Sequence, residues 1–286
     1  MSRSSRGSLG AILTCAALLA SLAVLAAGYR EATESPVVRR ASFLLPHWPR
    51  HAGPVTLLLM SDFHVQGPDM PPDRVRAIVG QANALHPDLI VAAGDFTSDK
   101  WFGTHRYPAR DAVSPLRALK APLGVFAVLG NHDFMRDEEA ARSALRAANV
   151  HVLDYAAVEA GPIALGGLDD RSGKSFGEMV KGEHRTFLAL RSLRGARILV
   201  AHGPDEFPVV PDDIGLMLAG HTHCGQIVLP LIGPIFTGSD YGRKYVCGIV
   251  RERGKTLLVN AGLGTSHVPI RLGAPPEMWL ITLHGR

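Results

Sequence analysis

Short apolar runs recur along the chain, and most of them end at a glycine or at a polar side chain. Runs of four or five apolar residues without polar alternation are typical of strands that are buried on both faces. The clearest runs occupy residues 57–60, 89–93, 125–129, 198–201 and 214–219. The pattern therefore predicts strands of a sheet that is covered on both sides.

Helical spacing of apolar residues occurs between the first of these runs. Pro72 and Asp73 suit the first turn of a helix, and apolar residues then follow at helical spacing as far as Leu85. Further helices are expected over residues 108–120, 137–149 and 183–193. Alternating strands and helices in the first half indicate the α/β class. Short strands dominate the second half, and we expect them at residues 150–153, 163–168, 226–229, 245–250, 256–259 and 278–283.

The N-terminal segment from Leu9 to Gly28 is almost entirely apolar. As a helix its roughly 20 residues would span about 30 Å, the hydrocarbon thickness of a bilayer. Arg3 and Arg6 precede it, as in a signal sequence or a signal anchor, but the apolar core of a cleaved signal is usually shorter, about 7–15 residues. We therefore expect a retained single-pass membrane anchor. Basic residues flank both of its ends, so the charges do not determine on which side of the membrane the rest of the chain lies.

These features predict one catalytic domain behind a membrane helix. The expected parts are a basic flank at 1–8, a transmembrane signal anchor at 9–29, a linker at 30–53 and the catalytic domain at 54–286. The linker contains the apolar patch Phe43-Leu44-Leu45, so we expect it to touch the membrane surface or to add an edge strand to the domain.

Composition and charge narrow the function further. The chain has 286 residues, of which 47% are hydrophobic, and its net charge is only +4. No dense basic tract with interleaved aromatic residues is present, which argues against a nucleic-acid partner. Cys15 lies in the apolar segment, whereas Cys224 and Cys247 could pair with each other. The cysteines therefore do not decide between a reducing and an oxidising compartment.

Ligand-type side chains follow five of the predicted strands. Because ligands bind beyond the carboxyl ends of strands in open α/β sheets, we expect these side chains to form one site. The set comprises Asp62, His64, Asp95, Asn131, His202, His221 and His223. It offers only oxygen and nitrogen donors, which suit Mn, Fe or Zn and argue against a thiolate-ligated site. Seven ligands are too many for one tetrahedral ion, but they suit two divalent ions that share a bridging carboxylate and act on a phosphoryl group.

The order of these motifs resembles the five motifs of the calcineurin-like metallophosphoesterases. They are Asp62-x-His64, Gly94-Asp95, Gly130-Asn131-His132-Asp133, His202 and Gly220-His221-Thr222-His223. The resemblance implies a sandwich of two mixed β-sheets flanked by helices, the metallo-dependent phosphatase-like fold. It also implies a metal-dependent hydrolase of phosphoric ester or phosphoanhydride bonds.

The same resemblance implies a role for each residue of the site. Asp62, His64 and His223 would hold the first ion. Asn131, His202 and His221 would hold the second, and Asp95 would bridge the two ions. His132 would be a catalytic residue that is not a ligand, and it would stabilise the transition state or protonate the leaving oxygen.

A narrower likeness concerns the membrane-anchored phosphoesterases that include UDP-2,3-diacylglucosamine pyrophosphatases of lipid A synthesis. It rests on residues 220–230, 241–245, 260–266 and 269–273. Cys224 departs from that pattern, which usually has a glycine there, and a glycine can serve a backbone angle that a cysteine adopts less readily. Arg243 and Lys244 could contact a substrate phosphate, although a solvated surface role is also open.

Three functions remain open on this basis. The first is hydrolysis of a lipid-linked substrate such as UDP-2,3-diacylglucosamine. The second is hydrolysis of a soluble or cell-wall phosphodiester outside the cytoplasm, and the third is a non-catalytic metal-binding module. The intact Asn131-His132 pair favours an enzyme over the third function.

Several polar residues next to the motifs have more than one interpretation. Asp133 could orient His132 or cap the following helix. Asp169 and Asp170 follow a predicted strand, where an aspartate pair more often forms a turn than a catalytic site. The histidines outside the motifs, His267 among them, are expected to be structural or surface residues.

Overall fold

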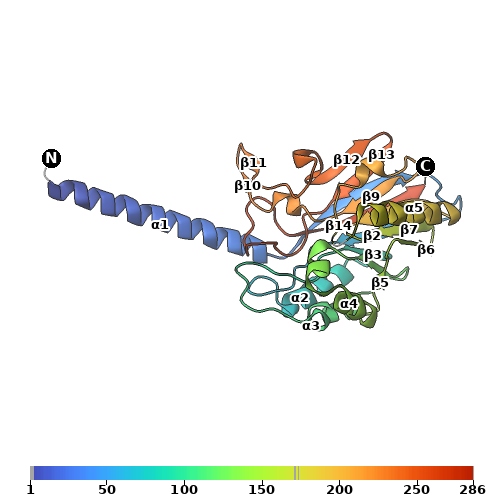
Figure 1. Ribbon diagram of the computed structural model, residues 1–286, viewed down its shortest axis with the longest axis horizontal. Helices are drawn as coiled ribbons and strands as arrows, with labels where there is room; N and C mark the ends of the chain where they lie inside the picture. The colour runs from blue at the N-terminus through green and yellow to red at the C-terminus, as the bar shows by residue number, and fades with distance from the viewer. Residues whose placement is uncertain (1–2, 171, 173, 286) are drawn as a thin grey trace.

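The computed structural model shows two six-stranded β-sheets packed face to face, with helices outside them and one long helix projecting from the body (Figure 1). It describes residues 3–170, 172 and 174–285, and for residues 3–9 it describes the backbone alone. Residues 1 and 2 of the expected basic flank 1–8 lie outside the described residues. The two mixed sheets confirm the fold class expected from the sequence.

The first sheet has the order β1-β14-β2-β3-β4-β5. Its strands are β1 (Val37–Leu45), β14 (Glu277–Gly285), β2 (Val55–Met60), β3 (Leu89–Ala93), β4 (Val125–Val128) and β5 (His151–Val152). Only the β14–β2 pair is antiparallel among the described strands of this sheet. The edge strand β1 lies within the stretch 30–53, so this stretch contributes backbone hydrogen bonds to the sheet.

The second sheet has the order β12-β13-β9-β8-β7-β6. Its strands are β6 (Ala156–Ala160), β7 (Ile163–Leu168), β8 (Ala196–Ala201), β9 (Leu216–Ala219), β12 (Gly248–Glu252) and β13 (Lys255–Val259). Its four central strands run parallel, and the two edge strands are antiparallel to their neighbours. A separate small hairpin is formed by β10 (Val228–Leu229) and β11 (Gly233–Pro234).

Strand β2 illustrates why the apolar runs contain no polar alternation. Successive side chains of a strand point to opposite faces. Leu57 and Leu59 pack into the core between the two sheets, whereas Leu58 and Met60 pack beneath the helices on the outer face. Both faces are therefore buried.

Helices cover the outer faces of the two sheets. The outer face of the first sheet is covered by α2 (Pro72–Asn83), α3 (Ala109–Val113) and α4 (Asn131–Ala147). The outer face of the second sheet packs against α5 (Phe176–Ser192). Short 3-10 turns occur at η1 (Ser114–Ala118), η2 (Phe207–Val209), η3 (His223–Gly225) and η4 (Gly242–Tyr245).

The N-terminal helix α1 (Arg3–Thr33) leaves the body at one end and is long and apolar enough from Gly10 to Thr33 to cross a membrane. Its last two turns are not free, because Gly28 and Ala32 are buried against the body. The backbone N–H of Arg271 donates to the carbonyl oxygen of Gly28 at 2.9 Å. The missing side chain of Gly28 permits this approach, since a Cβ there would lie 3.1 Å from the Cβ of Ile270.

Several expected element boundaries were wrong. The expected strand 245–250 begins only at Gly248, because residues 242–245 form the turn η4. The third helix begins at Asn131 instead of Asp137, and Asp137 instead marks an extended break inside α4. Helix α5 begins at Phe176, earlier than expected, because Ser175 and Glu178 form a capping box.

Candidate metal centre

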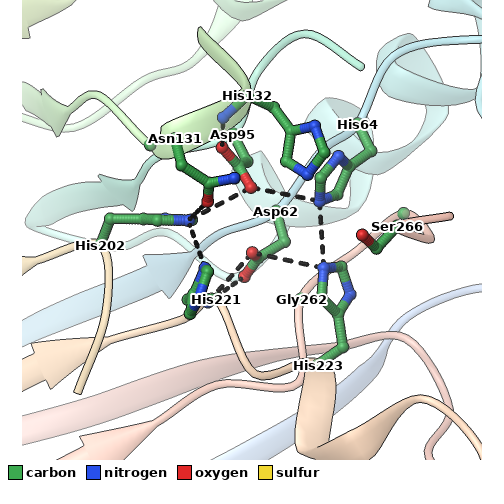
Figure 2. A network of polar contacts seen from close by, with 12 residues as sticks. Asp62, His64, Asp95, Asn131, His132, His202, His221, His223, Gly262 and Ser266 are labelled. Carbon is green, nitrogen blue, oxygen red and sulfur yellow. Dashed lines mark hydrogen bonds and ion pairs between the residues drawn. The ribbon is translucent and has the colours of Figure 1, made fainter. Parts of the chain in front are cut away.

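The carboxyl ends of five strands bring the seven candidate ligands and His132 together (Figure 2). Asp62 and His64 follow β2, Asp95 follows β3, and Asn131 and His132 follow β4. His202 follows β8, whereas His221 and His223 follow β9. The two sheets therefore each contribute to one group of donors.

The first cluster of donor atoms contains Asp62, His64 and His223, all buried. The Nε2 atoms of His64 and His223 lie 3.0 Å apart. The Nε2 atom of His223 also lies 3.5 Å from Oδ1 of Asp62. Two imidazole nitrogens and a carboxylate that converge in this way could hold one cation.

The second cluster contains Asp95, His202 and His221, together with the side-chain oxygen of Asn131. The Nε2 atom of His202 lies 3.1 Å from Oδ1 of Asn131 and 3.1 Å from Nδ1 of His221. This cluster also presents nitrogen and oxygen donors to a common centre, and it could hold a second cation.

One carboxylate oxygen lies between the two clusters. Oδ2 of Asp95 is 3.3 Å from Nε2 of His64 and 3.2 Å from Nε2 of His202. The other oxygen, Oδ1, accepts the backbone N–H of His132 at 2.9 Å, which fixes the orientation of the carboxylate. Asp95 is thus placed where it could contact cations in both clusters.

Burial and neighbouring charges set the protonation of the donors. Burial lowers the pKa values of His64 and His223 well below the usual range and that of His221 to about 4, so their ring lone pairs are available. Burial would also lower the pKa of His202, but the Asp95 carboxylate outweighs it and holds that pKa well above the usual range. Burial raises the pKa of Asp62 to about 6. The three neutral imidazoles of His64, His221 and His223 beside two buried carboxylates fit divalent cations.

A hydrogen bond to the main chain fixes the ring of His202. Its Nδ1 lies 2.8 Å from the carbonyl oxygen of Ala93, so Nδ1 carries the proton and donates it there. This leaves Nε2 to face Asp95 and Asn131. Such a second contact typically orients a metal-ligating imidazole.

The backbone of the ligand-bearing loops adopts an uncommon conformation. Left-handed φ angles between 46° and 70° occur at Asp62, His64, Asp95, His221 and His223. Such angles are uncommon for residues other than glycine and cluster at functional sites. Close packing adds a second constraint at Gly130, where a Cβ would lie 2.2 Å from Oδ1 of Asp95.

His132 differs from the other histidines in what its ring contacts. Its Nδ1 is hydrogen-bonded to a carboxylate oxygen of Asp99, a residue that the sequence motifs did not single out. Its ring lies edge-on to that of His64, with 4.7 Å between the ring centroids, and faces the centre of the group (Figure 2). A third possible donor cluster, His64, Asp95 and His132, therefore exists, so the geometry allows His132 to act either as a ligand or as a proton donor.

Asp133 does not contact the His132 ring among the described interactions. Its carboxylate accepts the backbone N–H groups of Phe96 and Thr97, at 3.0 and 2.9 Å, and that of Gly130 at 3.1 Å. It therefore braces the loop after β3 against the start of α4.

The aspartate pair after β7 has structural contacts. Asp169 is buried and pairs with Arg142, while Asp170 accepts the backbone N–H of Ser172 at 2.8 Å in a turn.

Arg271 lies in the segment 269–273 of the narrower likeness, but no role for its side chain could be assigned from the sequence. Its side chain is fully buried, and burial lowers its pKa to about 10. It donates to the carbonyl oxygens of Ala261 at 2.7 Å and Ala274 at 2.8 Å, and its Nη2 lies 3.1 Å from Nδ1 of His223. It thereby ties the loop after β13 to the ring of His223.

Cys224 and Cys247 form a disulfide immediately beside the first donor cluster. Cys224 has a left-handed φ of 51°, a conformation that glycine adopts more readily than other residues. The bridge attaches this residue, and with it the neighbouring His223, to the segment that leads into β12.

A cavity of about 410 Å³ opens over the donor group. Asp95, Asn131, His132, His221 and His223 form part of its lining. Much of the remaining wall is apolar and consists of Trp101, Met135, Ile227, Ile235, Phe236 and Val268. His267, expected to be structural or on the surface, also lines this cavity.

Arg243 and Lys244 are not among the lining residues of this cavity. Lys244 pairs with Glu252 at 2.9 Å, and Arg243 lies beside Gly233 of the β10–β11 hairpin. The structure does not bring either side chain into the donor group.

Comparisons with known proteins agree with this geometry. Residues 55–225, more than half of the chain, match the family model of the calcineurin-like phosphoesterases. An uncharacterized metallophosphoesterase of Aquifex aeolicus (strain VF5) is 32% identical over 81% of this chain and 86% of its own. The uncharacterized metallophosphoesterase YkuE of Bacillus subtilis (strain 168) is 33% identical over 73% of this chain and 72% of its own. A "transmembrane protein with metallophosphoesterase domain" of Danio rerio is 27% identical over 94% of this chain and 62% of its own.

The chain belongs to the calcineurin-like phosphoesterase family, the members of which are metal-dependent hydrolases of phosphoester bonds.

Proposed function

We propose that the chain is a membrane-anchored phosphoesterase whose site holds two divalent ions. Asp62, His64 and His223 would hold one ion, and Asn131, His202 and His221 the other. The observation that carries the proposal is the position of Asp95, because one of its oxygens lies within 3.3 Å of a histidine nitrogen in each cluster. When bound, two such ions activate water near neutral pH and neutralise the charge of the phosphoryl group.

The chain's own residues would then position the substrate and move a proton. The apolar cavity wall excludes water from one side of the site, and the site histidines face the space in which a phosphoryl group would lie. We assign His132 as the proton donor to the leaving oxygen, because its Nδ1 is already engaged by Asp99. An intact donor for the leaving group supports an enzyme over a non-catalytic metal-binding module.

The disulfide supports one of the two substrate hypotheses over the other. Disulfides persist in oxidising compartments and are rare in the cytosol. The Cys224–Cys247 bridge therefore favours a catalytic domain outside the cytoplasm and a phosphodiester substrate found there. Hydrolysis of UDP-2,3-diacylglucosamine in the lipid A pathway, with a cytoplasmic nucleotide, is the weaker candidate, and the comparisons give it no support.

The structure of α1 supports a retained anchor. The apolar helix continues without a break into turns that pack on the body through Gly28 and Ala32. A cleavage site near residue 28 would have to unwind a helix that is already docked. The segment 9–29 is therefore proposed to remain in the membrane as a single-pass anchor.

Two measurements test this proposal. The purified full chain should hydrolyse bis(4-nitrophenyl) phosphate, lose that activity in EDTA, and regain it with added Mn²⁺, Fe²⁺ or Zn²⁺. An activity that survives complete metal removal would contradict it. A reporter fused after residue 286 should be active only outside the cytoplasm, and a cytoplasmic signal would restore the nucleotide-lipid hypothesis.

A further inference from the structure

The run from Ile227 to Phe236 contains no polar side chain, yet the fold does not bury it. It forms the β10–β11 hairpin and its flanks, and Leu231 at the turn is fully exposed, with a relative accessibility of 109%. Trp101, in the loop after β3, is 74% exposed. We use the name apolar rim for six exposed side chains, Trp101, Phe102, Leu231, Ile232, Ile235 and Phe236.

Three of the six side chains of the apolar rim lie at the cavity of the metal centre. Trp101, Ile235 and Phe236 line the same cavity as Asn131 and His132. Phe102 follows Trp101 directly, and Leu231 and Ile232 lie in the turn between β10 and β11, close in sequence to Ile235. Exposed apolar side chains scattered singly are ordinary on a protein surface, whereas a group gathered at one cavity marks an interaction site.

Residues 267–273 form a short strip of chain that contacts the Trp101 loop, the base of the β10–β11 hairpin and the end of α1. The ring of Trp101 stacks on that of His267 at 4.7 Å, and Leu272 exchanges backbone hydrogen bonds with Gln226 and Val228 at the base of the hairpin. Between these points, Arg271 donates to Gly28 of α1. Figure 1 accordingly shows the β10–β11 hairpin at the end of the body from which α1 leaves.

We propose that the apolar rim is a second membrane contact, which inserts into the lipid surface beside the point where α1 enters the bilayer. This inference rests on the anchor described under the proposed function. An apolar stretch of about 20 residues fills the hydrocarbon layer, so a helix crossing from residue 9 reaches the opposite boundary near Gly28. The strip 267–273, which contacts the rim, is hydrogen-bonded to Gly28, so the rim lies near this boundary. Tryptophan, phenylalanine and aliphatic side chains favour this boundary, and their insertion would hold the cavity entrance against the headgroups.

The test uses the full chain in vesicles of phosphatidylcholine and phosphatidylglycerol. Leu231→Trp places a fluorophore at the hairpin turn, and Leu188→Trp places one at a half-exposed position on α5, at the other end of the body. With the wild-type signal subtracted, lipids brominated on the acyl chains should quench Leu231→Trp at least two-fold more than Leu188→Trp. Leu231→Trp should also emit at shorter wavelength.

Equal quenching of the two variants would overturn the proposal. A blue-shifted Leu231→Trp emission that brominated lipid leaves unquenched would also overturn it, and would point to a protein partner or a second copy of the chain. Hydrolysis of bis(4-nitrophenyl) phosphate by the same samples is a separate measurement of the proposed function, because Leu231 lies outside the cavity lining. Quenching can therefore fail while activity is retained, and activity can fail while quenching is retained.

Discussion

Nδ1 of His132 donates to the carboxylate of Asp99, four residues beyond the central Asp95. No other histidine of the donor group has a carboxylate at its outer ring nitrogen among the described interactions. Nδ1 of His202 contacts a carbonyl oxygen, and that of His223 lies near an arginine. A carboxylate at Nδ1 fixes the ring and leaves Nε2 toward the site, as a proton donor requires.

Replacing His132 should slow the chemical step and leave the metals in place. A positioned proton donor typically contributes about 10²- to 10⁴-fold, or roughly 3–5 kcal/mol of barrier. His132→Ala should therefore lower kcat by that range for an alkyl phosphodiester, and by less for a nitrophenyl ester, the leaving group of which needs no proton. Exposed His184 provides the control, and His184→Ala should change neither rate. Loss of metal from His132→Ala, or equal slowing of both esters, would make His132 a ligand or a purely electrostatic group.

Asp99 is expected to act only through His132. Partners that orient a metal-ligating histidine typically contribute about 10- to 100-fold, and we expect a similar factor for a partner that orients His132. Asp99→Asn should therefore lower kcat by that factor, with KM and metal content unchanged and with the leaving-group dependence of His132→Ala. The double variant should be no slower than His132→Ala alone, since the two residues would act as one unit. Additive losses in the double variant would show that Asp99 has an independent role.

Gly130 should not tolerate a side chain. A Cβ at this position would lie 2.2 Å from Oδ1 of Asp95, so Gly130→Ala should displace the central carboxylate and lower metal content together with activity. Gly80 in α2 is the matched control, because a Cβ there meets nothing within 4 Å. Gly80→Ala should raise stability by about 0.5–1 kcal/mol, as expected for a helix interior. Full metal content in Gly130→Ala would contradict this packing argument.

The disulfide should stabilise the chain and the His223 loop. A bridge that closes a loop of this size contributes typically about 2–4 kcal/mol, so Cys247→Ser should lower the unfolding temperature and weaken metal binding. Cys15 is free and exposed, and Cys15→Ser is the control. A reducing agent should lower the unfolding temperature of the wild-type chain to that of Cys247→Ser. An unfolding temperature unaffected by reduction would remove the argument for an oxidising compartment.

The strands that carry the site could be predicted because each is a run of apolar residues buried on both faces. Strand β6 was missed because Ala156–Ala160 is a partly exposed edge strand with little apolar pattern. The early start of α5 carried a usable signal, Ser175 followed three residues later by Glu178. A strand was expected at residues 226–229, where β10 occupies Val228–Leu229. The exposure of the apolar side chains that follow it could not be predicted, because exposure depends on what packs against a segment.

The candidate ligands could be predicted because their residue types and their places at strand ends are local features. Asp99 and Arg271 could not be assigned in this way. The role of Asp99 depends on a contact with His132, which is 33 residues away in the sequence. The role of Arg271 depends on contacts with loops that are brought around it only by the fold. Only the tertiary structure shows which of many polar residues meets a ligand.

The central claim is that Asp95 joins two metal ions, and elemental analysis of three purified proteins tests it most directly. The wild-type chain should carry about two divalent ions. Asp95→Asn should lose most of both ions, because its oxygen lies next to both clusters, whereas His223→Ala should mainly lose one. Activity should fall with the metal content. If Asp95→Asn kept both ions and full activity, the two-metal account of this site would be wrong.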